Sequence, residues 1–250
     1  MINHYAYWYF KNIFDDKFCQ KVIDLGLQEI DNLKKNKKST NATTHGKDLS
    51  KKKNDKRQPL NDKTISDLNI SKQNETYIRD SEVSWLSNQF IYDNVFPLVR
   101  EANQKSGWNY EFDFAEECQF TKYGLNQFYG WHADGNSCHL GKYKRAIPGV
   151  TPRDKNGMFP RGYTDNPDMV NKIRKLSLTI NLNLPGEYEG GNLKFDFGPH
   201  SQGNRYHECT EIRPQGSIIV FPSYIYHQVT PVTKGTRYSL VLWTLGKPFQ

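Results

Sequence analysis

The sequence is poor in cysteine and lacks both a long apolar run and a Cys-x-x-Cys pair. Its four cysteines lie far apart along the chain, which argues against a disulfide framework or a zinc ribbon. A reduced, cytoplasmic protein is therefore expected. No stretch of about 18 apolar residues is present, so the sequence predicts no membrane-spanning segment. The first residues also lack a basic start followed by an apolar stretch, and we expect no signal peptide.

Positive charge is unevenly distributed along the chain. The 250 residues carry a formal net charge of +7, which raises the question of a nucleic-acid partner. Residues 34–57 alone carry +8 and residues 141–175 carry +6, so the remainder carries −7. The basic residues thus belong to two segments rather than to a whole surface, and such runs are typical of solvated, mobile chain. We do not expect nucleic acid to be the partner.

The N-terminal half predicts helices around a polar insertion. Apolar residues at helical spacing indicate a helix over residues 17–33, preceded by a strand over residues 5–13. Residues 34–74 are dominated by Lys, Asn, Asp, Ser and Thr, and so polar a segment buries too little surface to offset the entropy of ordering it. We therefore interpret it as an inserted basic loop. A second helical region is expected over residues 84–102, with Pro97 breaking it or starting a new helix.

The C-terminal half predicts many short strands. Apolar and polar residues alternate from Leu176 to Leu182, in the clearest strand of the chain. Before it, residues 136–174 form a long stretch with glycine and proline but little periodicity, and loops of this length are often functional. Early helices followed by short strands predict one mainly β domain over residues 1–250, a β-sandwich or jelly roll buttressed by helices. The expected strands cover residues 108–114, 117–123, 175–183, 193–197, 217–221 and 236–245.

The chemistry is concentrated in the stretch from Gln127 to Asp134, which contains His132-x-Asp134. In an extended strand, residues two positions apart point to the same face, so an imidazole and a carboxylate would lie side by side. A third ligand must come from elsewhere, and His227 is the candidate. Two histidines and one carboxylate on one side of a divalent metal, with the other positions open, are typical of non-haem Fe(II) oxygenases. The sequence thus predicts a metal site at His132, Asp134 and His227.

An arginine and a serine follow the third ligand at short spacing. Arg237 comes ten residues after His227, and Ser239 follows two residues later. A guanidinium group can hold a carboxylate through two parallel hydrogen bonds. Arg237 is therefore predicted to bind a dicarboxylate co-substrate, with Ser239 beside it. An ordinary salt bridge is the alternative for Arg237.

The ordered set from His132 to Ser239 resembles the Fe(II)/2-oxoglutarate-dependent dioxygenases and, within them, the prolyl 4-hydroxylase-type branch. The resemblance covers roughly residues 118–243. It implies a double-stranded β-helix, a jelly-roll or cupin-like core, with N-terminal helices on one sheet. It also implies Fe(II) and 2-oxoglutarate as cofactors, with ascorbate as a further candidate, and dioxygen as a reactant. The implied reaction hydroxylates a peptidyl residue, proline foremost, and releases succinate and CO2.

The resemblance also suggests roles for further residues. Tyr123 matches a tyrosine that hydrogen-bonds 2-oxoglutarate in the family, although a core tyrosine fits equally well. Tyr129 and Trp243 are candidates for contact with the prime substrate, a peptide or protein, with plain core packing as the alternative. Arg79 is a candidate on position alone. The loop over residues 136–174 begins directly after the metal-binding stretch, so we interpret it as a lid close to the active site, with a surface insertion that does not contact substrate as the alternative.

Other functions share part of this pattern. A nucleic-acid demethylase of the alkylation-repair type usually carries a further arginine six residues after the first, but Trp243 stands at that position. A cupin-like binding protein with a vestigial site would not need the complete ligand set, and a zinc hydrolase gives Arg237 no role. The same chemistry on a non-peptide substrate stays open. The other five histidines, expected at surface or structural positions, are His4, His45, His139, His200 and His207.

Overall fold

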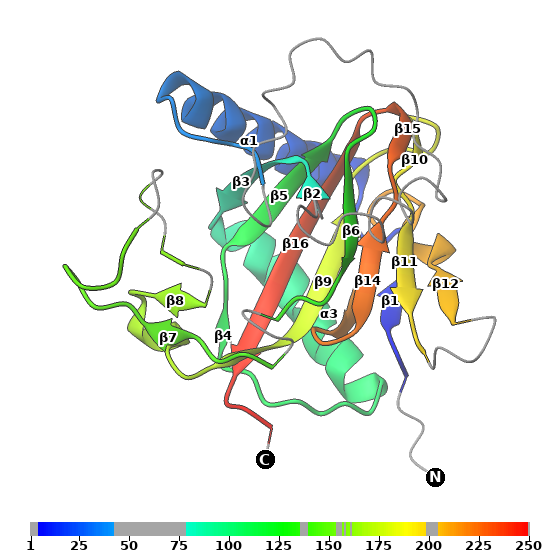
Figure 1. Cartoon of the computed structure of the whole chain (residues 1–250). Helices are drawn as coiled ribbons and strands as arrows, with labels where there is room; N and C mark the ends of the chain where they lie inside the picture. The colour runs from blue at the N-terminus through cyan, green and yellow to red at the C-terminus, as the bar shows by residue number, and fades with distance from the viewer. Residues whose placement is uncertain are drawn as a thin grey trace.

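The computed structural model describes residues 5–42, 79–135, 140–153, 157, 159–160, 162–198 and 205–249. Two antiparallel sheets face one another, and two helices pack on the outer side of the larger sheet (Figure 1). This mainly β arrangement confirms the predicted jelly-roll core with N-terminal helices on one sheet. Within the described residues, no helix is both long and apolar enough to cross a membrane.

Strands that are distant in the sequence lie side by side in both sheets, as in jelly rolls. The larger sheet runs in the order β1 (Trp8–Phe10), β13 (Ile218–Pro222), β9 (Ile173–Asn181), β16 (Arg237–Gly246), β5 (Cys118–Tyr123) and β3 (Glu82–Leu86), with β4 (Phe114–Ala115) beside β16. The smaller sheet runs in the order β12 (Tyr206–Glu208), β11 (Leu193–Asp196), β14 (Tyr226–Val229), β6 (Phe128–His132) and β2 (Arg79–Asp80). Two short pairs complete the strands, β10 (Tyr188–Gly190) with β15 (Val232–Gly235) and, in parallel, β7 (Lys144–Arg145) with β8 (Tyr163–Thr164).

Strand β9 shows why a polar site can lie between the sheets. Its alternating apolar residues, among them Leu178 and Ile180, belong to the main core together with the buried faces of the two helices. This confirms the apolar face predicted for the strand. Because side chains alternate along a strand, the residues between them, among them Thr179, face the smaller sheet. Polar side chains can therefore enter the space between the sheets, beside aliphatic ones such as Leu193 and Val229.

Helix α1 (Asp16–Lys35) confirms the first predicted helix. It begins at the cap residue Asp15, whose carboxylate accepts a hydrogen bond from the backbone N–H of Phe18 at 2.8 Å. Phe14 stacks on Phe18 with ring centroids 4.2 Å apart and so fixes how the chain enters the helix. Most of the insertion predicted over residues 34–74 lies outside the described residues, and its loop character stays a prediction.

Helix α1 packs closely on strand β5 at Gly26. A Cβ atom at this position would lie 2.2 Å from the ring of Phe120, which is fully buried. We expect Gly26→Ala to lower the free energy of unfolding by about 1 kcal/mol or more. Displacing Phe120 costs about 1–3 kcal/mol, and the gain in helix propensity of about 1 kcal/mol offsets only part of it. Urea unfolding measures the change.

The matched control for this substitution is Gln28→Ala, two residues further along the same helix and exposed. Surface substitutions of this kind usually stay within about 0.5 kcal/mol of the wild type. A Gly26→Ala variant more stable than the Gln28→Ala control would contradict the close approach of α1 and Phe120.

The second predicted helix begins later than expected. Residues 84–86 belong to the edge strand β3, and helix α3 (Gln89–Lys105) begins after it. The helix continues through Pro97, where the sequence predicted a break. An internal proline costs about 3 kcal/mol, but each buried apolar side chain contributes about 1.5–3 kcal/mol. The buried face of α3 carries several such residues, which together outweigh the proline: Ile91, Val95, Val99 and Ala102.

The alternating aromatic residues from Trp108 to Phe114 do not form the predicted strand. Asn109 has a positive φ of 49°, which interrupts an extended strand. Only the last predicted position, Phe114, belongs to β4 and pairs with β16. Trp108 is buried in the main core, and its Nε1–H donates to the carbonyl of Tyr5 at 2.6 Å. The aromatic pattern here reflects packing of an irregular segment.

Candidate active site

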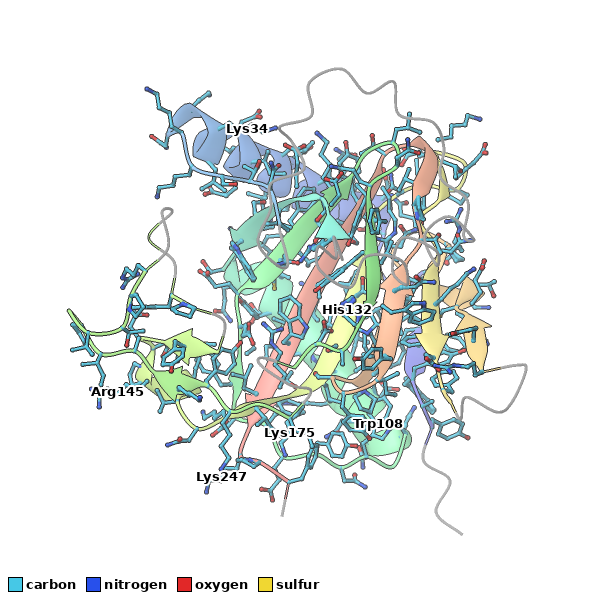
Figure 2. All side chains as sticks on the ribbon, viewed as in Figure 1. Lys34, Trp108, His132, Arg145, Lys175 and Lys247 are labelled. Atoms are coloured by element: carbon cyan, nitrogen blue, oxygen red, sulfur yellow. The ribbon has the colours of Figure 1, made fainter. Side chains whose placement is uncertain are left out.

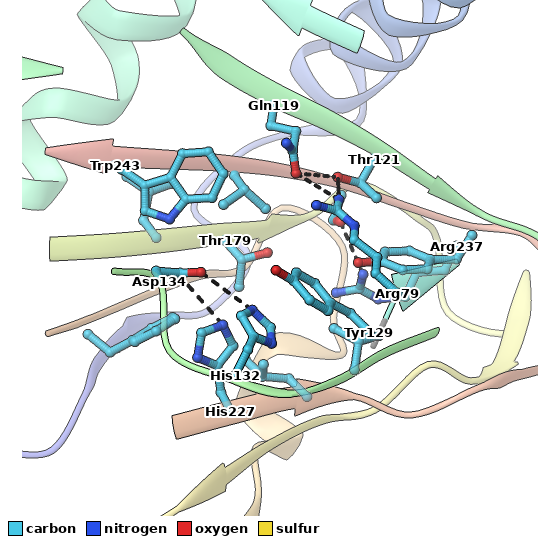
Figure 3. A pocket seen from close by; sticks show the side chains of 17 residues that line it. Arg79, Gln119, Thr121, Tyr129, His132, Asp134, Thr179, His227, Arg237 and Trp243 are labelled. Carbon is cyan, nitrogen blue, oxygen red and sulfur yellow. Dashed lines mark hydrogen bonds and ion pairs between the residues drawn. The ribbon is translucent and has the colours of Figure 1, made fainter. Parts of the chain in front are cut away.

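Three side chains from neighbouring strands meet between the sheets. His132 ends β6 and His227 lies in β14, where the two residues are paired directly opposite each other. Asp134 follows two residues after His132, and its backbone N–H donates to the carbonyl of Ser223 at 2.9 Å. One Asp134 oxygen lies 3.4 Å from His132 Nε2, and the other lies 3.6 Å from His227 Nε2. All three side chains are buried, and their ligand atoms lie within 4.8 Å of one another (Figure 3).

An irregularity in strand β6 brings Tyr129 to the same side as His132. His132 pairs with His227 and Tyr129 pairs with Val229, so three steps along β6 match two along β14. A bulge of this kind adds one residue to a strand and reverses its alternation. Tyr129 therefore stacks on His132 with ring centroids 3.4 Å apart. Figure 2 shows His132 near the centre of the molecule.

The backbone fixes the tautomer of both histidines. His132 Nδ1 lies 2.7 Å from the carbonyl oxygen of Gly130, and His227 Nδ1 lies 2.9 Å from that of Ile225. Because a carbonyl oxygen only accepts, Nδ1 carries the proton in each ring and Nε2 keeps its lone pair. A metal-binding imidazole needs this lone pair, and the hydrogen bond from its other nitrogen orients the ring. The donor set of two imidazoles and one carboxylate therefore fits Fe(II).

Burial and proximity give these residues the protonation states of metal ligands. Burial, together with the neighbouring His227, lowers the pKa of His132 to about 4, so the imidazole is neutral near pH 7. Burial alone would raise the pKa of Asp134, but the two imidazoles and Arg174 hold it well below its ordinary range. Asp134 is thus an anion and His132 a neutral donor, which are the forms that bind a metal.

Arg237 is buried in the same cavity without a carboxylate partner. Only 2% of its surface is exposed, and its Nη1 donates to the hydroxyl of Ser239 at 3.0 Å. No carboxylate among the described residues pairs with the guanidinium, and its buried Nε–H has no acceptor there. The ring of Tyr123 lies 5.4 Å from its Cζ. The structure thus brings Arg237, Ser239 and Tyr123 together, and the N–H groups of Arg237 can donate to a carboxylate. The roles of the three residues toward a co-substrate stay predictions.

The three residues predicted to contact substrate line the same cavity. Trp243 lies with Asp134 at one end, and its buried indole N–H has no acceptor among the described residues (Figure 3). Arg79 lies near Arg237 at the other end, with its Cζ 4.6 Å from the centre of the Tyr129 ring. The cavity therefore joins the candidate metal ligands, the candidate co-substrate residues and the candidate substrate residues.

A buried ion pair behind the site was not predicted from the sequence. Arg174 donates two hydrogen bonds of 2.6 Å to the carboxylate of Glu116 and a third, at 3.0 Å, to the backbone carbonyl of Asp134. Its guanidinium also lies over the ring of Trp243, 3.9 Å from the centre. Tyr143, in the loop after the metal-binding stretch, donates to Glu116 at 2.8 Å. The ion pair thus ties this loop to the backbone that carries Asp134.

We expect Arg174→Met to lower the free energy of unfolding by about 3–5 kcal/mol, because Glu116 would stay buried without a counter-charge, with the hydroxyl of Tyr143 as its remaining donor. The double variant Arg174→Met/Glu116→Gln removes both charges and should lose much less, since replacing a whole buried pair is often nearly neutral. Urea unfolding of the two single variants and the double variant measures the coupling. Equal losses in Arg174→Met and the double variant would show that the pair does not act as a unit.

The loop predicted over residues 136–174 contains short regular elements. Strands β7 and β8 pair in parallel, and a 3-10 helix covers Pro167–Met169. Figure 1 shows the two strands outside the pair of large sheets. Both residues of β7, Lys144 and Arg145, are exposed. The action of this loop as a lid stays a prediction.

Among the five histidines predicted to be structural, His207 alone lies in the described part of the chain. Its Nε2 lies 2.9 Å from the hydroxyl of Tyr7, and the two rings stack with centroids 5.6 Å apart. No second group of metal-binding side chains is present among the described residues. Their three cysteines are free and buried, as expected without a disulfide framework: Cys19, Cys118 and Cys209.

Comparison of the sequence with known families identifies its class. The sequence profile of the 2OG-Fe(II) oxygenase superfamily matches residues 118–245, half of the chain. The matched region contains His132, Asp134, His227 and Arg237. The chain therefore belongs to the 2OG-Fe(II) oxygenase superfamily, as its ordered ligand set predicted.

Curated relatives include proteins named PKHD-type hydroxylase. The one from Xylella fastidiosa (strain 9a5c) is 31% identical over 125 residues, which are 50% of this chain and 42% of that protein. The one from Synechococcus sp. (strain JA-2-3B'a(2-13)) is 33% identical over 91 residues, which are 35% of this chain and 38% of that protein. The chain thus matches less than half of the length of these relatives.

Solved structures of prolyl hydroxylases share the fold. The viral collagen prolyl hydroxylase from Paramecium Bursaria Chlorella virus-1, in its 2OG complex, superimposes with a TM-score of 0.55 at 16% identity, over 98% of this chain and 99% of that chain. A prolyl hydroxylase from Trichoplax adhaerens, in complex with a hypoxia inducible factor peptide fragment, gives a TM-score of 0.54 at 16% identity, over 97% and 84%. These likenesses confirm the predicted architecture.

Proposed function

We propose that the chain is an Fe(II)- and 2-oxoglutarate-dependent dioxygenase that hydroxylates a peptidyl residue, with proline as the first candidate. One observation carries the proposal. A single cavity holds the buried donor set of His132, Asp134 and His227 and, at its other end, the guanidinium of Arg237 without a carboxylate partner. The first group suits Fe(II), and the second suits the distal carboxylate of 2-oxoglutarate. Proline comes first because structures with this fold are named prolyl hydroxylases.

The residues of the chain have distinct tasks in this proposal. His132, Asp134 and His227 hold the metal, while Arg237 and Ser239 hold 2-oxoglutarate. When bound, metal and co-substrate supply the oxidising chemistry, with succinate and CO2 as products. The backbone carbonyls behind the two imidazoles orient the donors, and the burial of the cavity keeps water from the reacting groups.

Succinate formation on a panel of proline-containing peptides tests the proposal. The purified chain is supplied with Fe(II), 2-oxoglutarate and dioxygen, with and without ascorbate. Mass spectrometry then measures the mass of each peptide. We expect succinate to rise with peptides that gain one oxygen atom, and omission of Fe(II) to abolish both signals. The same panel with alanine in place of proline is the control.

Two results would contradict the proposal in different ways. Equal stimulation by the alanine panel would show that proline is not the hydroxylated residue. No succinate under any condition, with Fe(II) present, would refute the assignment of the cofactors.

A further inference from the structure

The cavity contains a second buried arginine, Arg79. Only 9% of its surface is exposed, although it belongs to the two-residue strand β2 at the edge of the smaller sheet. Its side chain crosses to the larger sheet, where Nη2 donates to Gln119 Oε1 at 2.8 Å and lies 3.5 Å from the hydroxyl of Thr121. Its Nε donates to the hydroxyl of Ser81 at 2.9 Å. The guanidinium is thus held firmly at the wall of the cavity.

Arg79 has no carboxylate partner in the described part of the chain. Its partners are an amide oxygen, two hydroxyls and the face of Tyr129, and no carboxylate of the described residues forms an ion pair with it. Arg174 differs, because it pairs with Glu116 through two hydrogen bonds of 2.6 Å. A buried guanidinium without a counter-charge is unfavourable unless a ligand supplies one.

The proposed cofactors do not supply this counter-charge. Asp134 and one carboxylate of 2-oxoglutarate balance the two positive charges of Fe(II), and the second carboxylate balances Arg237. Asp134 is the one acidic side chain among the described residues that line the cavity, whereas two arginines line it. Among the described residues, Arg79 is then left as a cation without an anion, and a further ligand can supply its counter-charge.

The position of Arg79 relates it to the prime substrate. Its guanidinium lies over Tyr129, 4.6 Å from the ring centre, and Tyr129 in turn stacks on the metal-ligand candidate His132. An anion at Arg79 would therefore be separated from the candidate metal centre by about one aromatic ring. Neighbouring groups of one peptide or of one small molecule can reach both places.

We infer that Arg79 binds a carboxylate of the prime substrate, next to the position that is hydroxylated. The inference rests on the proposed function and adds the charge of the substrate to it. The carboxylate has two sources, an acidic side chain beside the hydroxylated residue or the terminal carboxylate of an amino acid. A guanidinium recognises both through the same pair of hydrogen bonds.

Binding without dioxygen tests this inference separately from turnover. The first pair of probes consists of two proline peptides that differ only in glutamate or glutamine beside the proline, and the second pair is L-proline and L-prolinamide. Calorimetric titration compares the wild type with Arg79→Gln and with the exposed control Arg100→Gln. Each protein is loaded with Fe(II) and 2-oxoglutarate.

We expect the wild type to bind the carboxylate member of one pair roughly 10- to 100-fold more tightly, which is the contribution of a charge-assisted hydrogen bond. Arg79→Gln should lose this preference, whereas Arg100→Gln should keep it. The pair that shows the preference identifies the source of the carboxylate. Without ligand, the thermal midpoint of Arg79→Gln should not be lower than that of the wild type, because an uncompensated buried charge is removed.

Several results would overturn the inference. One is equal affinity, or no binding, for both members of both pairs, and another is a preference that survives in Arg79→Gln. A weaker affinity of Arg79→Gln for 2-oxoglutarate, with the substrate preference intact, would place Arg79 in the co-substrate site instead. A lower thermal midpoint with the preference intact would make it a structural link between the sheets.

Aerobic assays with the same peptides separate this inference from the proposed function. Peptides that are bound through Arg79 but not hydroxylated would refute prolyl hydroxylation and leave the carboxylate site standing. Peptides that are hydroxylated without any preference for glutamate would exclude an acidic side chain as the source of the carboxylate. If L-proline and L-prolinamide also bind equally, the carboxylate site is refuted and the proposed function stands.

Discussion

Alanine in place of His132, Asp134 or His227 is expected to reduce turnover of 2-oxoglutarate by roughly 10³-fold or more. Each substitution removes one of three donors whose ligand atoms lie within 4.8 Å of one another, and the remaining two no longer form the facial set. The fold should survive, because none of the three side chains belongs to the main core. Succinate formation and anaerobic titration with Fe(II) measure the two losses, and thermal unfolding checks the fold.

Two controls sharpen this experiment. Asp134→Asn keeps the shape of the side chain but removes its charge, so it should lose Fe(II) as Asp134→Ala does. His207→Ala removes a histidine that is hydrogen-bonded to Tyr7 and belongs to no metal-binding group, and it should keep both turnover and Fe(II) affinity. Full activity in any two of the three ligand variants would refute the metal site.

These residues could be selected from the sequence because their chemistry restricts the choice of residue types. A histidine and an aspartate two positions apart, a second histidine and an arginine ten residues beyond it form an ordered set that few other functions need. The sequence contains no distances. The structure places His132, Asp134, His227 and Arg237 on the lining of one cavity, and their roles stay predictions.

The core strands could be predicted where burial leaves one solution. Strand β9 was expected over residues 175–183 and covers Ile173–Asn181, with every residue but Arg174 buried. Alternating leucine and isoleucine over this length fit a strand of a covered sheet and hardly fit an exposed segment. Helix α1 was equally predictable, because the capping residue Asp15 and the apolar residues at helical spacing indicate the same helix.

Tertiary contacts decided the elements that were misjudged. Residues 84–86 favour a helix locally, but β3 pairs with β5 along its whole length, and the sheet determines their conformation. A bulge in β6 turns Tyr129 toward His132. The sequence does not reveal this bulge, because strict alternation would place the two side chains on opposite faces. Asp134 lies beyond the end of β6 and not within a strand. The hydrogen bond from the backbone N–H of Asp134 to the carbonyl of Ser223 positions it beside His132.

The ion pair of Arg174 and Glu116 was missed for a related reason. The two residues are 58 positions apart, and each has other charged residues beside it, Glu117 after Glu116 and Lys175 after Arg174, so nothing in the sequence selects this pair. Their pairing depends on how β9 and the segment before β5 meet in the folded sheet. Arg174 lies one position before the predicted strand over residues 175–183, so the sequence did not mark it as a charge that needs a buried partner.

Arg237→Ala is expected to raise the KM for 2-oxoglutarate by roughly 10²-fold or more, because two charge-assisted hydrogen bonds to the distal carboxylate would be lost. The guanidinium is already removed from water in the free protein: its exposed fraction is 2%, and it has no carboxylate partner among the described residues. Binding of an anion therefore adds an ion pair without a further desolvation penalty for Arg237. Steady-state kinetics with varied 2-oxoglutarate, and calorimetric titration without dioxygen, measure the effect.

Arg237→Lys separates charge from geometry at this position. A lysine keeps the positive charge but not the planar pair of donors, so its KM should lie between those of the wild type and Arg237→Ala. Loss of the hydroxyl beside it, in Ser239→Ala, should have a smaller effect than either, because this hydroxyl carries no charge and Arg237 would keep its guanidinium. The exposed variant Arg100→Gln should leave the KM unchanged. An unchanged KM in Arg237→Ala would mean that another cation holds the co-substrate, and Arg79, the other arginine of the cavity lining, would be the residue to substitute next.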